Sequence, residues 1–154
     1  QVVSRLFDIV QPDYAYFGEK DWQQIAVVKR LVQFMNSNIE IVECPIVREE
    51  SGLAMSSRNE RLSADERMLA ANIYKALKAS VEKAKTLTLG ETRNWVVAEI
   101  NAHEGLEVEY FSIVDGLTLV DLDSWNDSEY VVGCITVYCG STPIRLIDHI
   151  KYKG

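Results

Sequence analysis

The spacing of apolar residues changes from helical to extended near the start of the chain. Residues 2–10 carry apolar side chains at helical spacing, and Pro12 ends that pattern. The aromatic run YAYF at residues 14–17 suits a short buried strand that ends at Gly18. We therefore expect a helix followed by a strand.

A second helix and a second strand follow along the chain. Helical spacing returns in residues 22–35, and Asp21 with Gln24 forms a capping-box pattern at the start of this helix. The segment IEIVECPIV at residues 39–47 suits a strand that Pro45 interrupts. Strand, helix and strand in this order predict a βαβ crossover in a parallel sheet, hence an α/β fold.

Beyond Arg48 the pattern changes. Residues 49–62 are polar and rich in turn-forming residues, which is typical of a loop between two units. The tetrapeptides SADE and TLGE are capping-box patterns, and each opens a predicted amphipathic helix. Three strand candidates then follow, at residues 108–115, 130–140 and 143–150. Two helices before three successive strands predict a small α+β domain with a three-stranded antiparallel sheet.

The change of pattern divides the chain into two predicted domains, residues 1–46 and residues 47–154. The hydrophobic share of 47% and the charged share of 25% are those of a globular chain. No run approaches the roughly 20 apolar residues that a bilayer span requires, so we expect no membrane partner. The formal charge of -7 argues against a nucleic-acid partner, which selects a basic face.

The cysteines and histidines argue against a disulfide-stabilised protein and against a metal-binding protein. The three cysteines form no CxxC pair and leave an odd count, which argues against a disulfide framework and favours a cytoplasmic protein with reduced thiols. The two histidines, His103 and His149, lie in no metal-ligand spacing, so we expect no metal site in these residues.

The stretch FGEKDWQQ offers candidate chemistry where the first strand meets the second helix. A helix N-terminus after Gly18 presents unpaired N–H groups that suit anionic oxygens, and Lys20 adds a positive charge. Asp21 could accept hydrogen bonds from ribose hydroxyls, and Gln24 has both donors and acceptors. The plainer alternative is that Asp21 and Gln24 cap the helix while Glu19 and Lys20 are solvated.

A second polar stretch, LAMSSRN, lies in the predicted loop between the two units. Ser56, Ser57 and Arg58 combine two hydroxyls with a forked guanidinium donor, which suits a polyphosphate. By themselves these residues fit equally well a serine-rich turn with an exposed arginine.

Together the two stretches resemble the pantoate–β-alanine ligase family. FGEKDWQQ is followed by PIVREESGLAMSSRN, then by LSADERMLAANIYKAL and RLID, so the resemblance spans essentially the whole chain. It implies the tail of a Rossmann-like nucleotidyltransferase domain with a parallel sheet, followed by a C-terminal lid domain. The implied reaction uses ATP and Mg2+ to convert pantoate into a pantoyl adenylate, which β-alanine then attacks to give pantothenate and AMP.

The resemblance also implies roles for the residues of the first stretch. Gly18 and Asp21 match positions that contact the ribose, and Lys20 matches one that contacts phosphate. Glu19 belongs to the ATP-binding group by motif, through its backbone or as a solvated side chain. Gln24 matches a glutamine that binds pantoate.

In the second stretch, Val47 matches a backbone contact to adenine and Met55 lines the base pocket. Ser56, Ser57 and Arg58 match the phosphate loop. Together with Lys20 of the first stretch, these three residues are the catalytic candidates.

One part of the family's pattern is missing. The family carries an HxGH motif near its N-terminus and forms homodimers largely through that half, and this chain contains no such motif. We therefore expect the chain to be a C-terminal half that is inactive alone. Two alternatives stay open: a non-catalytic ATP-binding or regulatory module, and another adenylate-forming ligase with a different partner for Gln24.

Overall fold

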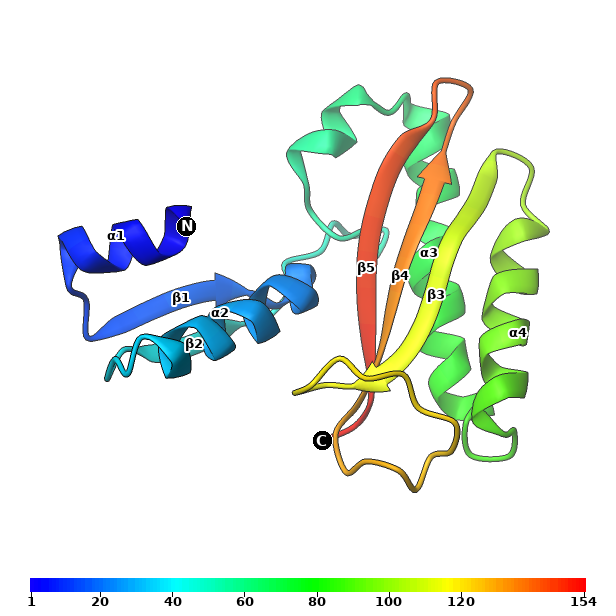
Figure 1. Cartoon of the computed structure of the whole chain (residues 1–154). Coiled ribbons are helices and arrows are strands. Elements are labelled where there is room, and N and C mark those ends of the chain that lie inside the picture. The colour runs from blue at the N-terminus through cyan, green and yellow to red at the C-terminus, as the bar shows by residue number, and fades with distance from the viewer. The chain divides into compact units, whose positions relative to one another are not determined.

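The computed structural model describes all of residues 1–154, and the chain divides into two compact units, Gln1–Ile46 and Val47–Gly154. Helices and strands follow in the order expected from the sequence (Figure 1). None of the helices combines the length and the apolar character that a membrane span requires. The cysteines are free thiols, and Cys134 and Cys139 are buried.

The first unit contains a parallel pair of strands with two helices. Its elements are α1 (Val2–Val10), β1 (Tyr14–Gly18), the 3-10 helix η1 (Glu19–Asp21), α2 (Trp22–Phe34) and β2 (Glu40–Cys44). Strands β1 and β2 pair in parallel, with Gly18 opposite Cys44 at their carboxyl ends. This confirms the predicted βαβ crossover.

A small apolar core holds the first unit together. Phe7 of α1 and Val28 and Val32 of α2 are buried together, with side chains of both strands packed against them. The buried positions of α2 recur at helical spacing, and its exposed side carries both polar residues and the apolar side chains of Val27 and Phe34.

The second unit is an antiparallel sheet covered by two helices. Its elements are the 3-10 helix η2 (Ser57–Arg61), α3 (Ala64–Lys83), α4 (Leu89–Asn101), β3 (Leu106–Asp115), β4 (Val131–Cys139) and β5 (Ile144–Lys153). The strand order is β3-β4-β5, which confirms the predicted three-stranded sheet. Figure 1 shows α3 and α4 side by side against one face of this sheet.

Capping boxes start both helices of the second unit, as predicted. The hydroxyls of Ser63 and Thr88 accept hydrogen bonds from the backbone N–H groups of Glu66 and Glu91, whose carboxylates accept from the capping residues in return. These hydrogen bonds lower the pKa of both glutamates, the backbone contact being the larger cause in each. Helix α3 therefore begins where the loop of residues 47–62 ends.

Candidate functional site

The first polar stretch lies at the carboxyl end of β1. Gly18 is the last residue of the strand, and Glu19 to Asp21 form the short helix η1 that leads into α2. Gly18 has φ −69° and ψ 130°, and a Cβ built on it meets no atom within 4 Å. The space beside Gly18 is therefore open, and its backbone conformation is one that any residue adopts.

The predicted capping box at α2 is wrong. Asp21 occupies the N-cap position, but its side chain makes no capping hydrogen bond. The reason is the preceding 3-10 turn, which leaves Asp21 at φ −93° and ψ 62°. The caps of α3 and α4, Ser63 and Thr88, have the extended backbone (ψ 169° and 163°) from which a short side chain reaches the first turn. The Asp21 carboxylate is consequently not used to cap the helix.

Gln24 lies on the exposed side of α2. Trp22, Ile25 and Val28 are buried, and Gln24 is off this stripe and exposed. Because it lies two residues beyond the N-terminal residue of α2, its amide is within one helical turn of the exposed Asp21. The first stretch thus combines Gly18, Glu19, Lys20, Asp21 and Gln24 in one continuous segment, as expected from their spacing.

In the second unit, residues 47–55 fold back on themselves. The backbone N–H of Met55 donates to the carbonyl of Val47 at 3.0 Å, and Arg48 pairs with Ala54 in an antiparallel bridge. Val47 and Met55, predicted to contact the adenine, are therefore neighbours, and both are exposed, by 66% and 55%. One lone pair of the Val47 carbonyl is already used, so a base would contact its N–H or the second lone pair.

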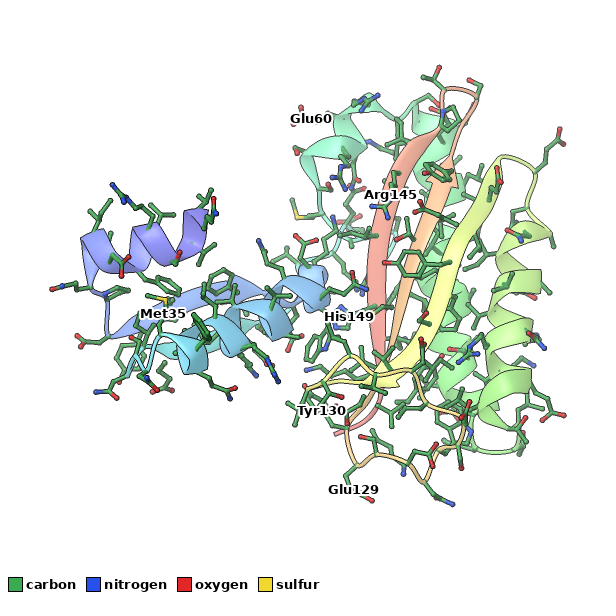
Figure 2. All side chains as sticks on the ribbon, viewed as in Figure 1. Met35, Glu60, Glu129, Tyr130, Arg145 and His149 are labelled. Carbon is green, nitrogen blue, oxygen red and sulfur yellow. The ribbon has the colours of Figure 1, made fainter.

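The predicted phosphate residues follow directly. Ser56 is the N-cap of η2, and its hydroxyl accepts from the Arg58 N–H at 3.2 Å. Ser57 and Arg58 are exposed, and the Arg58 guanidinium makes one long contact, 3.5 Å, to the carbonyl of Arg145 on β5. In Figure 2 the η2 segment, where Glu60 is labelled, lies beside the part of β5 that carries Arg145.

The serine hydroxyls and the guanidinium fork of this segment can therefore approach an anion from one short stretch of chain. The chain contains no group of three or more His, Cys, Asp or Glu side chains that could hold a metal ion.

Sequence reasoning missed the residues that support this loop. Arg48 bonds Asp148 through both guanidinium nitrogens, at 2.7 and 2.9 Å, and the Asn59 amide donates to the Glu49 carboxylate at 3.0 Å. Asp148 is 7% exposed and Asn59 is 2% exposed. A charged residue inside a strand pattern, such as the aspartate of RLID, was the one available signal, since a buried carboxylate requires a partner.

Comparisons with known proteins agree with the sequence pattern. A family model described as Pantoate-beta-alanine ligase matches residues 1–151. A pantothenate synthetase of Bacteroides thetaiotaomicron is 58% identical over 153 residues, which are 99% of this chain and 54% of that protein. A second one, of Porphyromonas gingivalis, is 52% identical with the same shares covered.

Solved structures share the fold. A pantothenate synthetase of Thermus thermophilus matches with a TM-score of 0.90 and 37% identity, over 100% of this chain and 55% of that one. A pantoate–β-alanine ligase of Francisella tularensis, complexed with "Beta-gamma ATP" and β-alanine, matches with a TM-score of 0.67 and 30% identity, over 98% and 48%. The chain spans about half the length of the curated relatives it matches.

Proposed function

The chain belongs to the pantoate–β-alanine ligase family, and on that premise we propose that it is the C-terminal half of an enzyme that joins pantoate to β-alanine at the expense of ATP. The reaction proceeds through a pantoyl adenylate and releases pyrophosphate and AMP. The two units correspond to the end of a Rossmann-like nucleotide-binding domain and to a C-terminal lid domain.

One observation carries this proposal. Where β1 meets α2, the helix starts without a side-chain cap although an aspartate stands at the capping position. Ligands of parallel α/β sheets bind beyond the carboxyl ends of the strands, and a helix N-terminus attracts anions. The polar groups at this helix start, with Gly18, Lys20 and Asp21 beside them, are therefore suited to bind a nucleotide, since the Asp21 side chain does not cap the helix.

Each residue of the first polar stretch then has a role in binding ATP or pantoate that its chemistry supports. Gly18 leaves room for the ribose, whose hydroxyls donate to the Asp21 carboxylate, and the Lys20 ammonium binds phosphate oxygens. Glu19 contributes through its backbone. Gln24, further along α2, holds pantoate by its amide group.

The second unit supplies the remaining contacts to ATP. Val47 and Met55, which are hydrogen-bonded neighbours, form one wall of the adenine pocket. The hydroxyls of Ser56 and Ser57 and the guanidinium of Arg58 donate to phosphate oxygens.

The chemistry needs no protein nucleophile. A carboxylate oxygen of pantoate attacks the α-phosphorus of ATP, the new P–O bond forms and pyrophosphate leaves. The amine of β-alanine then attacks the acyl carbon, the bond to AMP breaks, and the amine loses a proton. Lys20 and Arg58 stabilise the charge that develops on the transferring phosphorus, and the remaining groups hold the reactants in line.

The proposed reaction also needs a metal ion and a histidine motif that this chain does not supply. Mg2+ is expected with the phosphates of ATP, since magnesium is commonly held by substrate phosphates and one or two carboxylates. The HxGH histidines of the family are not in this sequence. We therefore propose that residues 1–154 alone do not catalyse the reaction.

The test is a product analysis of the full-length protein with ATP, pantoate and β-alanine, and with each of the three omitted in turn. Pantothenate, AMP and pyrophosphate are expected in equal amounts only when all three are present. Formation of ADP and phosphate would contradict the adenylate route. ATP binding without turnover in any mixture would favour a non-catalytic module.

A further inference from the structure

The segment Met55–Arg58 forms a short exposed arch between two buried residues. Ala54 before it is 3% exposed and Asn59 after it is 2% exposed, whereas Met55, Ser57 and Arg58 are exposed. The Asn59 amide donates to the Ala54 carbonyl at 3.1 Å and so ties the two ends together. The position of the arch therefore depends on what holds its two ends.

An ion pair between a partly buried arginine and a buried aspartate holds the first end. Arg48, which pairs with Ala54 in the antiparallel bridge, donates through both nitrogens to the two carboxylate oxygens of Asp148 on β5. The same guanidinium donates to the Gly52 carbonyl at 3.1 Å and lies 3.6 Å above the ring of Tyr74 on α3. One side chain thus ties the loop to both the sheet and the helix layer.

The geometry of this pair fixes orientation as well as distance. A bidentate contact between guanidinium and carboxylate allows one planar arrangement, and the Asp148 carboxylate is further held by its contact to the His149 N–H at 2.8 Å. A buried ion pair stabilises a fold little compared with apolar residues of similar size. Stability alone therefore gives a weak reason for charges at Arg48 and Asp148.

A second polar contact set holds the other end of the arch. The Asn59 amide donates to the carboxylate of Glu49, the neighbour of Arg48, and Arg67 of α3 donates to the Asn59 carbonyl at 3.1 Å. Strand β5 also meets the arch itself, through the contact between Arg58 and the Arg145 carbonyl. Asp148 and Arg145 therefore connect the same strand to both ends of the arch.

We propose that Arg48 and Asp148 are a positioning pair, which sets the arch of residues 55–58 against β5 so that its serine and arginine donors meet the phosphates of ATP. This inference rests on the proposed function. Neither member of the pair touches the nucleotide. Because donors displaced from the phosphates bind them less tightly, loss of the pair weakens the binding of ATP without unfolding the unit.

The main test replaces the pair by apolar residues in the full-length protein, as the double variant Arg48→Met with Asp148→Leu. This variant leaves no buried unpaired charge and is expected to fold. Arg48→Lys is the second variant, which keeps the charge but lacks the fork. Tyr152→Phe is the control, because it removes the partly buried hydrogen bond between Tyr152 and Ser80 in the same unit and leaves the arch intact.

Steady-state kinetics and thermal unfolding are measured for each variant. The KM for ATP is expected to rise at least about tenfold in the double variant and in Arg48→Lys, with the KM for pantoate changed less than about twofold. Tyr152→Phe is expected to lower Tm and to leave both constants unchanged. A folded double variant with the wild-type KM for ATP would overturn the proposal, as would a double variant that does not fold, since the pair would then serve stability alone.

A second readout does not depend on activity. Trypsin cleavage after Arg58, which lies in the exposed arch, is expected to be at least about tenfold faster in the double variant than in the wild type, because a loosened arch opens more often. Equal cleavage rates would overturn the positioning role. If the wild-type protein has no ligase activity, the proposed function fails while the cleavage rates still decide the role of the pair.

Discussion

Replacement of Gly18 by alanine separates a role in folding from a role in binding. The backbone at Gly18 has φ −69° and ψ 130°, which alanine adopts without strain, and the added Cβ meets no protein atom within 4 Å. A compatible glycine-to-alanine change reduces the freedom of the unfolded chain and adds about 0.4–1 kcal/mol to the free energy of unfolding. The melting temperature should therefore stay the same or rise by about 4 °C at most.

The effect on ATP should have the opposite sign. In the proposed complex the ribose occupies the open space beside Gly18, and a methyl group there would overpack the contact. Overpacking typically costs about 1–3 kcal/mol, which corresponds to a KM or Kd for ATP about 5- to 150-fold higher. The variant is thus expected to be as stable as the wild type or more so, and to bind ATP less tightly.

Gly90→Ala provides the matched control. Gly90 lies in the first turn of α4, and a Cβ built on it also meets nothing within 4 Å. Alanine there should stabilise the helix by up to about 1 kcal/mol and leave ATP binding unchanged. Calorimetric titration with ATP and thermal unfolding of both full-length variants form the assay. Equal ATP affinity in the two variants would refute the ribose assignment, and a destabilised Gly18→Ala would refute the structural reading.

Three further outcomes are expected. Gln24→Ala should raise the KM for pantoate at least about tenfold and that for ATP far less, and equal losses would remove Gln24 from the pantoate site. The hydroxyl of Ser128 is the main cause that lowers the pKa of Asp115 from 3.8 to about 2 in the folded chain. The stabilisation that the ionised Asp115 carboxylate gives is therefore present above pH 3.8 and lost as the pH falls towards 2. Urea unfolding should show Asp115→Asn to be less stable than the wild type at about pH 6, with a smaller difference at about pH 3. A difference that stays constant with pH would contradict the assignment. Iodoacetamide should modify Cys44, which is partly exposed, well before Cys134, because burial raises the pKa of the Cys134 thiol to about 12; equal labelling rates in the folded protein, read by mass spectrometry, would contradict that burial.

The sequence predicts those features whose causes are local. Ser63 and Thr88 stand before amphipathic segments with a glutamate three residues later, and both form the expected caps. Asp21 has the related pattern with Gln24 three residues later but does not cap, because a 3-10 turn sets its backbone before α2 begins. Such a turn leaves no periodic signal in the residue types, so the pattern alone could not distinguish Asp21 from Ser63.

Contacts between distant segments are the second class that the sequence does not predict. The positions of Ser56 to Arg58 could be proposed from their residue types and from the family resemblance. The pair that supports them could not, because Arg48 and Asp148 are separated by 100 positions. Their contact depends on the folded arrangement of the loop and β5, not on neighbouring residues in the sequence.

The central claim is that the two polar stretches belong to an enzyme that activates pantoate as an adenylate, and isotope exchange tests it most directly. The full-length protein is incubated with ATP, pantoate and labelled pyrophosphate in the absence of β-alanine, and the label in ATP is followed over time. The account predicts exchange that requires pantoate and that is strongly reduced in Lys20→Ala. Absence of exchange in a protein that makes pantothenate, or exchange that does not need pantoate, would contradict it.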